Sequence, residues 1–333
     1  MKAICVTRER KLEVRDVTFP EAPPPPGHVF IDIDSATITH GDKFFLTRPL
    51  PGGNALSSGG QDVYGANASG KVTAIGEGVP IRFLGKQVAI YKSLARSAGS
   101  IGVWSERAQL PYSTCLILPD EVRVRDYCGS FANILTVYAF LAEIRATGHK
   151  GVIVTAGTSA TGLIAASLTQ RFGVNAIFLV RSGKARERLI QHGVDHVLVT
   201  TEPQFDDKLS RLAAELEATA VFDGVGGELL TRTIPNLSVN STIYVYGFLG
   251  SSHPASFSTM LLVGKNVTIR RFSNLESQTV IDPAQLTAAT RAIEEFVHDP
   301  LFATNVGKEF QFDEIHDALS YETVPGRRAI LVP

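Results

Sequence analysis

The sequence predicts an α/β protein in which a mostly β segment precedes a doubly wound parallel sheet. Two observations carry this prediction. Up to about residue 120, short β-type runs alternate with Pro and Gly, which is typical of a barrel or sandwich. From about residue 150, apolar runs of the fully buried type alternate with helical stretches, which indicates a parallel sheet. A chain of 333 residues has room for about two such domains.

The elements follow from these patterns in chain order. The first segment contains the runs Val29–Ile33, Gly70–Ile75 and Gln87–Tyr91. The parallel sheet is expected from Val152–Thr155, Ala176–Val180, His196–Thr200, Ala220–Asp223, Thr242–Gly247 and Val267–Arg270. Helices are expected at Gly162–Phe172, Ala185–His192, Phe205–Leu216 and Pro283–His298. Two short final segments, Glu309–Phe312 and Ala329–Val332, are expected to return to the β domain.

These patterns predict three regions along the chain. Residues 1–122 form the catalytic domain, residues 123–270 the nucleotide-binding domain, and residues 271–333 a segment that returns to the first. Residues 46–60 are rich in Gly, Pro and Ser without periodicity, so we expect a mobile loop there.

Composition narrows the classes of partner and compartment. A formal charge of −1 provides no field for nucleic acid or an anionic membrane. No uninterrupted apolar run approaches the ~20 residues that span a bilayer, and the N-terminal stretch lacks the features of a secretory signal. Cys5, Cys115 and Cys128 form neither a disulfide framework nor a Cys-x-x-Cys site. We therefore expect a cytoplasmic protein that binds neither nucleic acid nor membrane.

The most informative segment is a buried strand that runs into a turn of small residues and then a helix. Small side chains allow backbone N–H groups and a helix N-terminus to approach a pyrophosphate, whose charge the helix dipole favours. Alternatively, the small residues are needed only for tight packing between the strand and the helix. Because the turn opens the alternating pattern, we expect it to bind phosphate. Its predicted binding residues are Thr158, Ser159, Ala160, Thr161 and Gly162.

The end of the next strand distinguishes between the two nicotinamide dinucleotides. An acidic side chain there would accept hydrogen bonds from the adenosine ribose, and none is present. Arg181, Ser182 and Lys184 instead offer donors and positive charge suited to a 2′-phosphate. Alternatively, Arg181 and Lys184 are solvated charges in a loop and bind no phosphate. The sequence favours NADPH and NADP over NADH and NAD.

Several landmarks together resemble the medium-chain dehydrogenase/reductase superfamily, nearly end to end. They are the proline-glycine entry 24–29, the "G-x-V-x-x-V-G-x-G-V" stretch 70–79, the "G-D-x-V" stretch 85–88, the "G-x-x-A-E" stretch 102–106, the "L-T-A-Y" stretch 135–138 and the "D-x-V-G-G" stretch 223–227. The resemblance is to its zinc-free branch of quinone oxidoreductases and enoyl reductases. It implies a GroES-like β-barrel catalytic domain, a Rossmann domain and a cleft between them.

The resemblance also implies residue roles and an assembly. The positions expected near the nicotinamide half of the cofactor are Thr136, Val225, Gly247, Phe248 and Asn274. Family members often pair through the sixth strand of the Rossmann sheet, so a homodimer is expected through about 267–270.

Departures from the family pattern decide the subclass. Zinc-dependent alcohol dehydrogenases place Cys at the position of Thr39 and Gly-His-Glu at 65–67, where this chain reads Gly-Ala-Asn. The segment 91–102 also lacks the cysteines of the structural zinc lobe. We therefore expect no metal.

Ser159 replaces the middle glycine of the turn, which puts the affinity for the cofactor in question. Leu46 stands where quinone-reductase-like relatives usually carry arginine.

Without a Lewis acid, a conjugated acceptor is the expected substrate, because hydride addition to a quinone, enone or enoyl compound gives a delocalised anion. Thr39, Tyr64 or Asn67 is expected to supply a hydrogen bond or proton. Phe44 and Phe45, with Phe248, are expected either to line the substrate pocket or to belong to the core. Two other functions stay open, a zinc-independent carbonyl or alcohol dehydrogenase and a non-catalytic relative that binds nucleotide or RNA.

Overall fold

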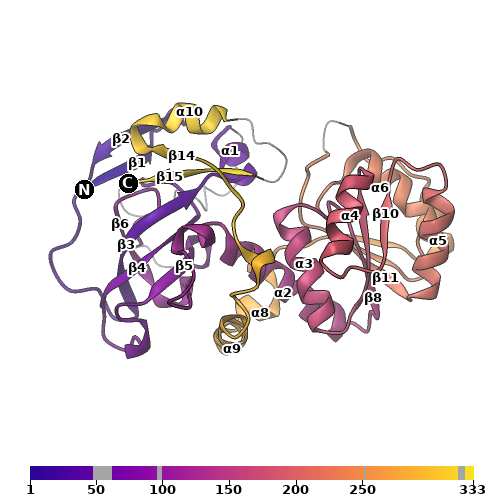
Figure 1. Cartoon of the computed structure of the whole chain (residues 1–333), viewed down its shortest axis with the longest axis horizontal. Helices are drawn as coiled ribbons and strands as arrows, with labels where there is room; N and C mark the ends of the chain where they lie inside the picture. The colour runs from indigo at the N-terminus through magenta and orange to yellow at the C-terminus, as the bar shows by residue number, and fades with distance from the viewer. Residues whose placement is uncertain (48–61, 96–99, 251–252, 322–326) are drawn as a thin grey trace. The chain divides into compact units, whose positions relative to one another are not determined.

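The computed structural model describes residues 1–47, 62–95, 100–250, 253–321 and 327–333. The chain divides into two units, one formed by Met1–Ile134 with Leu286–Pro333 and the other by Leu135–Gln285 (Figure 1). These boundaries lie later in the chain than the expected 122/123 and 270/271. The predicted loop over 46–60 falls almost entirely outside the described residues.

Hydrogen bonds explain why the first boundary lies inside a helix. The backbone N–H of Gly129 donates to Thr304 Oγ1 over 2.9 Å, and Ser130 Oγ donates to the carbonyl of Phe302 over 2.5 Å. The start of helix α2 (Ser130–Ala146) is thereby tied to the C-terminal segment of the first unit. Sequence patterns do not reveal such long-range bonds.

The first unit is built on a seven-stranded sheet with the order β14-β15-β3-β4-β5-β7, in which β6 also pairs with β3. Both termini belong to this unit, as Figure 1 shows. Its strands are β1 (Lys2–Val6), β2 (Leu12–Asp16), β3 (His28–Thr37), β4 (Asn67–Ile75), β5 (Gln87–Tyr91), β6 (Arg107–Pro111), β7 (Cys115–Ile117), β14 (Val306–Gln311) and β15 (Arg328–Val332). Its short helices are α1 (His40–Thr47) and α10 (Ile315–Ser320).

The core of the first unit explains its strand pattern. Val29, Ile31 and Ile33 of β3 are buried in one cluster with residues of the later strands. β15 pairs antiparallel with β3 and parallel with β14, so the C-terminal segments return to the first unit as predicted. The three predicted strands of this region are confirmed. The β1–β2 hairpin and α1 were not predicted.

The second unit is a six-stranded parallel sheet with the order β10-β9-β8-β11-β12-β13. The expected doubly wound sheet is therefore confirmed, with all six of its predicted strands. They are β8 (Gly151–Val154), β9 (Asn175–Val180), β10 (Val197–Val199), β11 (Ala218–Asp223), β12 (Thr242–Val245) and β13 (Thr268–Arg271). The helices between and after them are α3 (Ala160–Arg171), α4 (Gly183–Gln191), α5 (Phe205–Glu215), α6 (Gly227–Thr233), α7 (Thr259–Lys265) and α8 (Gln278–Ile281). Helix α9 (Pro283–Glu294) begins at the end of the second unit and lies mostly in the first.

Helix packing in the second unit follows burial at helical spacing. Phe205, Leu209 and Ala213 of α5 recur every four residues and are all buried. Helix α2 instead is apolar on all sides and was not predicted. The stretch 124–146 is long and apolar enough to cross a bilayer, yet 67% of its apolar window is buried inside the protein. Phe140 of this helix, for example, stacks on Phe222 at 4.1 Å between ring centroids.

Candidate functional site

The turn between β8 and α3 has the backbone geometry expected of a phosphate-binding turn. Ala156 adopts a left-handed φ of 52°, and Ser159 is the N-cap of α3. The Ser159 hydroxyl accepts a hydrogen bond from the backbone N–H of Gly162 over 3.1 Å. A Cβ on Gly162 would lie 2.5 Å from the carbonyl oxygens of Ala156 and Gly157. Only glycine therefore allows the helix to begin this close to the turn.

This arrangement fits a pyrophosphate. Thr158, Ser159, Ala160 and Thr161 are all only half-buried at the start of a twelve-residue helix. The first N–H groups of a helix have no acceptor within the helix, and the helix dipole makes them attract an anion. The five predicted residues of this turn are thus brought together at one helix N-terminus. Ser159 has a role that the sequence did not indicate, because its hydroxyl caps the helix.

Tyr246 closes one side of the turn and was missed by the sequence reasoning. Its ring stacks on Phe222 at 3.9 Å between centroids. Its hydroxyl bonds the side chains of Ser159 and Thr161, and burial raises the pKa of Tyr246 above its usual range. A Cβ on Gly224 would lie 2.5 Å from the same hydroxyl oxygen. Tyr246 therefore stays protonated beside the N-terminus of α3.

A buried carboxylate fixes the loop after β11. Asp223 is 0% exposed, and its Oδ1 accepts hydrogen bonds from Thr155 Oγ1 over 2.7 Å and from the Val225 N–H over 3.1 Å. The loop after β12 docks on it, since the N–H of Gly247 donates to the Asp223 carbonyl over 3.3 Å. Val225 and Gly247, both expected near the nicotinamide, are thus brought together. Phe248 is half-buried in the same loop.

Two further residues expected near the nicotinamide contact each other. Asn274 Nδ2 donates to Thr136 Oγ1 over 2.8 Å. Asn274 is 6% exposed and begins the 3-10 helix that follows β13, whereas Thr136 belongs to α2. The side chains are 138 residues apart in sequence, so the fold of the second unit brings them together.

The residues after β9 are exposed, as a ribose-phosphate site requires. Arg181, Ser182 and Lys184 are all exposed at the end of the strand and the start of α4. The Ser182 hydroxyl caps α4 by accepting from the Ala185 N–H over 3.3 Å. Within the described part of the chain, Arg181 and Lys184 form no ion pair. Their charges are therefore available to an anionic ligand.

In the first unit, Thr39 and Tyr64 meet around a buried carboxyl group. Thr39 caps α1, because its Oγ1 accepts the Asp42 N–H over 3.1 Å while Asp42 Oδ2 accepts the Thr39 N–H over 2.7 Å. The Thr39 hydroxyl also donates to Asp42 Oδ2 over 2.5 Å. The Tyr64 hydroxyl donates to the Asp42 carbonyl over 3.0 Å. Burial raises the pKa of Asp42 to about 6. Both predicted hydroxyls thus hold the start of α1.

The three predicted catalytic residues differ in burial and in whether their polar atoms are already hydrogen-bonded. Tyr64 is 0% exposed and packs edge-on against Trp104 at 5.1 Å, and burial raises its pKa. Asn67 begins β4, is 6% exposed, and its Oδ1 has no hydrogen-bond partner among the described residues. Asn67 is therefore the one of the three that has an unused buried acceptor.

Zinc does not fit this set of residues. At the positions of two zinc ligands in alcohol dehydrogenases stand Thr39, whose hydroxyl donates to Asp42, and Ala66, which has no ligating atom. Within the described ranges, no group of three His, Cys, Asp or Glu side chains is close enough to hold a metal ion.

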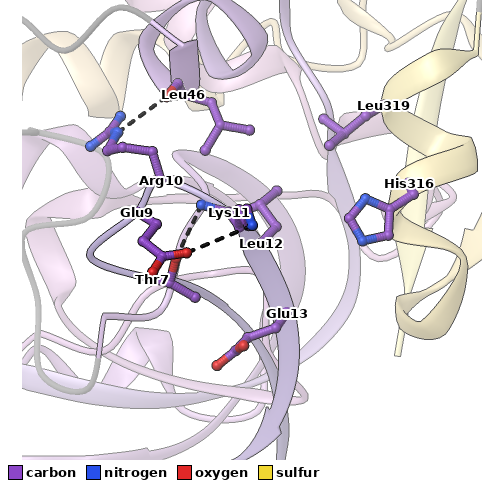
Figure 2. A pocket seen from close by; sticks show the side chains of 9 residues that line it. All are labelled: Thr7, Glu9, Arg10, Lys11, Leu12, Glu13, Leu46, His316 and Leu319. Atoms are coloured by element: carbon purple, nitrogen blue, oxygen red, sulfur yellow. Dashed lines mark hydrogen bonds and ion pairs between the residues drawn. The ribbon is translucent and has the colours of Figure 1, made fainter.

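A pocket of about 410 Å³ lies elsewhere in the first unit (Figure 2). Apolar and charged side chains mix in its lining, and Arg10 Nε donates to the Leu46 carbonyl there over 3.1 Å. It is lined by Thr7, Glu9, Arg10, Lys11, Leu12, Glu13, Leu46, His316 and Leu319. None of the predicted catalytic residues lines it. Phe44 is half-buried on α1, and the Phe45 side chain lies outside the described part of the structure.

Comparisons with known proteins agree with this architecture. A family model described as zinc-binding dehydrogenase matches residues 160–289. The structure of Escherichia coli quinone oxidoreductase complexed with NADPH aligns with a TM-score of 0.72 at 19% identity, over 100% of this chain and 99% of that chain. A mutant form of enoyl thioester reductase from Candida tropicalis aligns with a TM-score of 0.79 at 16% identity, over 100% and 99%.

The chain is similar to zinc-binding dehydrogenases and to quinone oxidoreductases. Among curated relatives, the rat synaptic vesicle membrane protein VAT-1 homolog is 24% identical over 185 residues, which cover 55% of this chain and 44% of that protein. The chain thus spans about half the length of the first curated relatives that it matches. Its similarity is to the zinc-free, quinone-oxidoreductase-like branch, as the sequence predicted.

Proposed function

We propose that this protein is an NADPH-dependent oxidoreductase that reduces conjugated acceptors, namely quinones, enones or enoyl compounds, without a metal. The observation that carries the proposal is the capped small-residue turn after β8, together with Arg181 and Lys184 at the end of the neighbouring strand β9, which form no ion pair with any described residue. A helix N-terminus suits the pyrophosphate and the two cations suit the 2′-phosphate. The NADPH-bound quinone oxidoreductase of the same fold supports this assignment.

Each residue would have a defined task toward the cofactor. Ala160 and Thr161 would offer backbone N–H groups to the pyrophosphate, and the hydroxyls of Ser159, Thr161 and Tyr246 would bound it on one side. Asn274 and Thr136, locked by their mutual hydrogen bond, would orient the nicotinamide end. NADPH, when bound, supplies the hydride of the reaction.

The proposed substrate class follows from the side chains at positions 39 and 66 of the first unit, which do not bind zinc. With Thr39 and Ala66 unable to bind zinc, no Lewis acid polarises an isolated carbonyl. A conjugated acceptor needs only hydrogen-bond donors for the anion that it becomes. The enoyl thioester reductase of the same fold supports an acceptor of this class.

The experiment has two steps. Fluorescence titration measures the binding of NADPH and NADH, and NADPH oxidation is then followed with a quinone, an enone, an enoyl thioester and a simple aldehyde. We expect tight NADPH binding, turnover with the conjugated acceptors and little with the aldehyde. Aldehyde as the best acceptor would identify a carbonyl reductase, and binding without turnover would identify a binding protein. Stoichiometric zinc in active protein would refute the metal-free proposal.

A further inference from the structure

Lys92 is a charged side chain buried inside the first unit. It is 2% exposed and ranks among the largest fully buried side chains. Burial of an ammonium group in a protein interior is costly, and such groups cluster at functional sites. Burial lowers the pKa of Lys92 to about 8. A lysine buried at the end of a strand is therefore a candidate functional residue.

Sheet register places Lys92 next to the predicted catalytic positions. Asn67 is the cross-strand partner of Tyr91, and the N–H of Lys92 donates to the Ala66 carbonyl over 2.8 Å. Lys92 is therefore the cross-strand neighbour of Ala66 on the adjacent strand end. Ala66 occupies the position where zinc-dependent relatives have a histidine ligand. A cationic residue thus lies beside the place that a metal ion would occupy in those enzymes.

The third strand end completes this edge of the sheet. β3 neighbours β4, and their ladder reaches the pair Ala36 and Ala68. The chain then continues from β3 to Thr39, just as β4 is preceded by Ala66. Thr39, Asn67 and Lys92 therefore follow or begin three adjacent strands at the same end of the sheet. Asn67 Oδ1 is buried there without a hydrogen-bond partner among the described residues.

We propose that Lys92 is the group that stabilises and then protonates the oxyanion of the reduced acceptor. This inference rests on the proposed function. When hydride adds to the β-carbon of an enone, a C–H bond forms and the π electrons move to the carbonyl oxygen. The Lys92 ammonium donates an N–H to that oxygen and then transfers its proton, which leaves a neutral amine that water reprotonates.

The local charges suit this role. An ammonium group with a pKa near 8 is charged at neutral pH yet gives up its proton more readily than an exposed lysine. Asn67 is neutral where zinc-dependent relatives have glutamate, so it does not neutralise the cation. Lys92 thus offers in part what a Lewis acid offers elsewhere, a fixed positive charge near the reacting oxygen.

The test compares Lys92→Met, Lys92→Arg and the surface control Lys71→Met on neighbouring β4. With a quinone and an enone at saturating NADPH, we expect Lys92→Met to lower kcat by roughly 10²- to 10³-fold while the Kd for NADPH stays unchanged. Lys71→Met is expected to leave both unchanged. Wild-type kcat in Lys92→Met, or a loss of NADPH binding that explains the whole defect, overturns the proposal.

A second measurement needs neither NADPH nor turnover. 4-Nitrophenol is a mimic of the oxyanion, and its absorbance reports whether it is bound as phenol or as phenolate. We expect wild-type protein to raise the ionised fraction above that in buffer. Lys92→Met should abolish this increase, whereas Lys92→Arg should retain it without restoring kcat, because arginine keeps the charge but does not release its proton.

The two measurements distinguish a failure of the Lys92 proposal from a failure of the proposed function. If no acceptor supports NADPH oxidation, the proposed function is refuted while the phenolate measurement still tests Lys92. If Lys92→Met does not fold, Lys92→Gln replaces it. Wild-type protein that binds 4-nitrophenol only in its neutral form overturns the proposal without any variant.

Discussion

Replacement of Arg181 by alanine tests the proposed specificity for NADPH. Arg181 is exposed after β9 and forms no ion pair within the described structure, so its removal breaks no contact that the fold depends on. A hydrogen bond to a charged group contributes about 1.5–3 kcal/mol. Because the site is exposed and Lys184 stays nearby, the lower end applies, which corresponds to roughly tenfold weaker binding.

The assay measures Kd for NADPH and NADH by fluorescence titration, and KM for both where turnover is found. Arg181→Ala should weaken NADPH binding roughly tenfold and change NADH binding by less than about twofold. Arg186→Ala is the matched control, since Arg186 lies on α4 but already pairs with Glu202 at 2.7 Å. Equal losses for both cofactors, or no change for either, would remove Arg181 from the 2′-phosphate site.

Three further perturbations probe the turn, the buried carboxyl group and the open sheet edge. Gly162→Ala forces a Cβ to within 2.5 Å of two carbonyl oxygens, so thermal denaturation should show a loss of about 1–3 kcal/mol and titration should show weaker NADPH binding. Gly183→Ala, with nothing within 4 Å of its Cβ, is the control that should lose neither, and equal effects at both sites would refute the steric argument. Because burial raises the folded pKa of Asp42 to about 6 from its usual value of 3.8, the folded state binds more protons between these values, and stability should fall by about 3 kcal/mol as pH rises through them. Urea denaturation across this range should show a flatter profile for Asp42→Asn, and an unchanged profile would refute the assignment. The Thr268 and Phe272 N–H groups donate to the β12 side of β13, so the Ile269 N–H faces the open edge by alternation, and Ile269→Pro should convert the expected homodimer to a monomer in light scattering. A monomeric wild-type protein, or a variant that still dimerises, would count against this edge as the interface.

Local patterns predicted the strands and the turn, and they failed where burial depends on distant partners. The six strands of the second unit were predictable because each carries its own run of apolar residues. Lys92 gave no signal, since a lysine after a strand is usually exposed and only the pairing with Ala66 shows its environment. Asp42 was missed for a similar reason. The spacing Thr39-x-x-Asp42 does suggest a helix cap, but its burial depends on Tyr64 and the core around it.

The serine in the turn after β8 is coupled to two residues that follow neighbouring strands. Ser159 follows β8, Gly224 follows β11 and Tyr246 follows β12, so the three positions lie at neighbouring strand ends of one sheet. The absence of a Cβ on Gly224 leaves the space into which the Tyr246 hydroxyl extends, and that hydroxyl bonds Ser159 in turn. A glycine at position 159 would offer no such partner, and the tyrosine would then have one fewer hydrogen bond at a buried oxygen.

This coupling changes how the turn would bind an anion. The Ser159 hydroxyl already accepts the Gly162 N–H, so that donor is satisfied by the protein's own side chain. The remaining attraction comes from the N–H groups of Ala160 and Thr161 and from the hydroxyls beside them. The pyrophosphate would therefore be held by fewer backbone donors than in a turn with glycine at this position. The cations after β9 must then account for a larger share of the affinity, which is why the loss at Arg181 should be measurable despite its exposure.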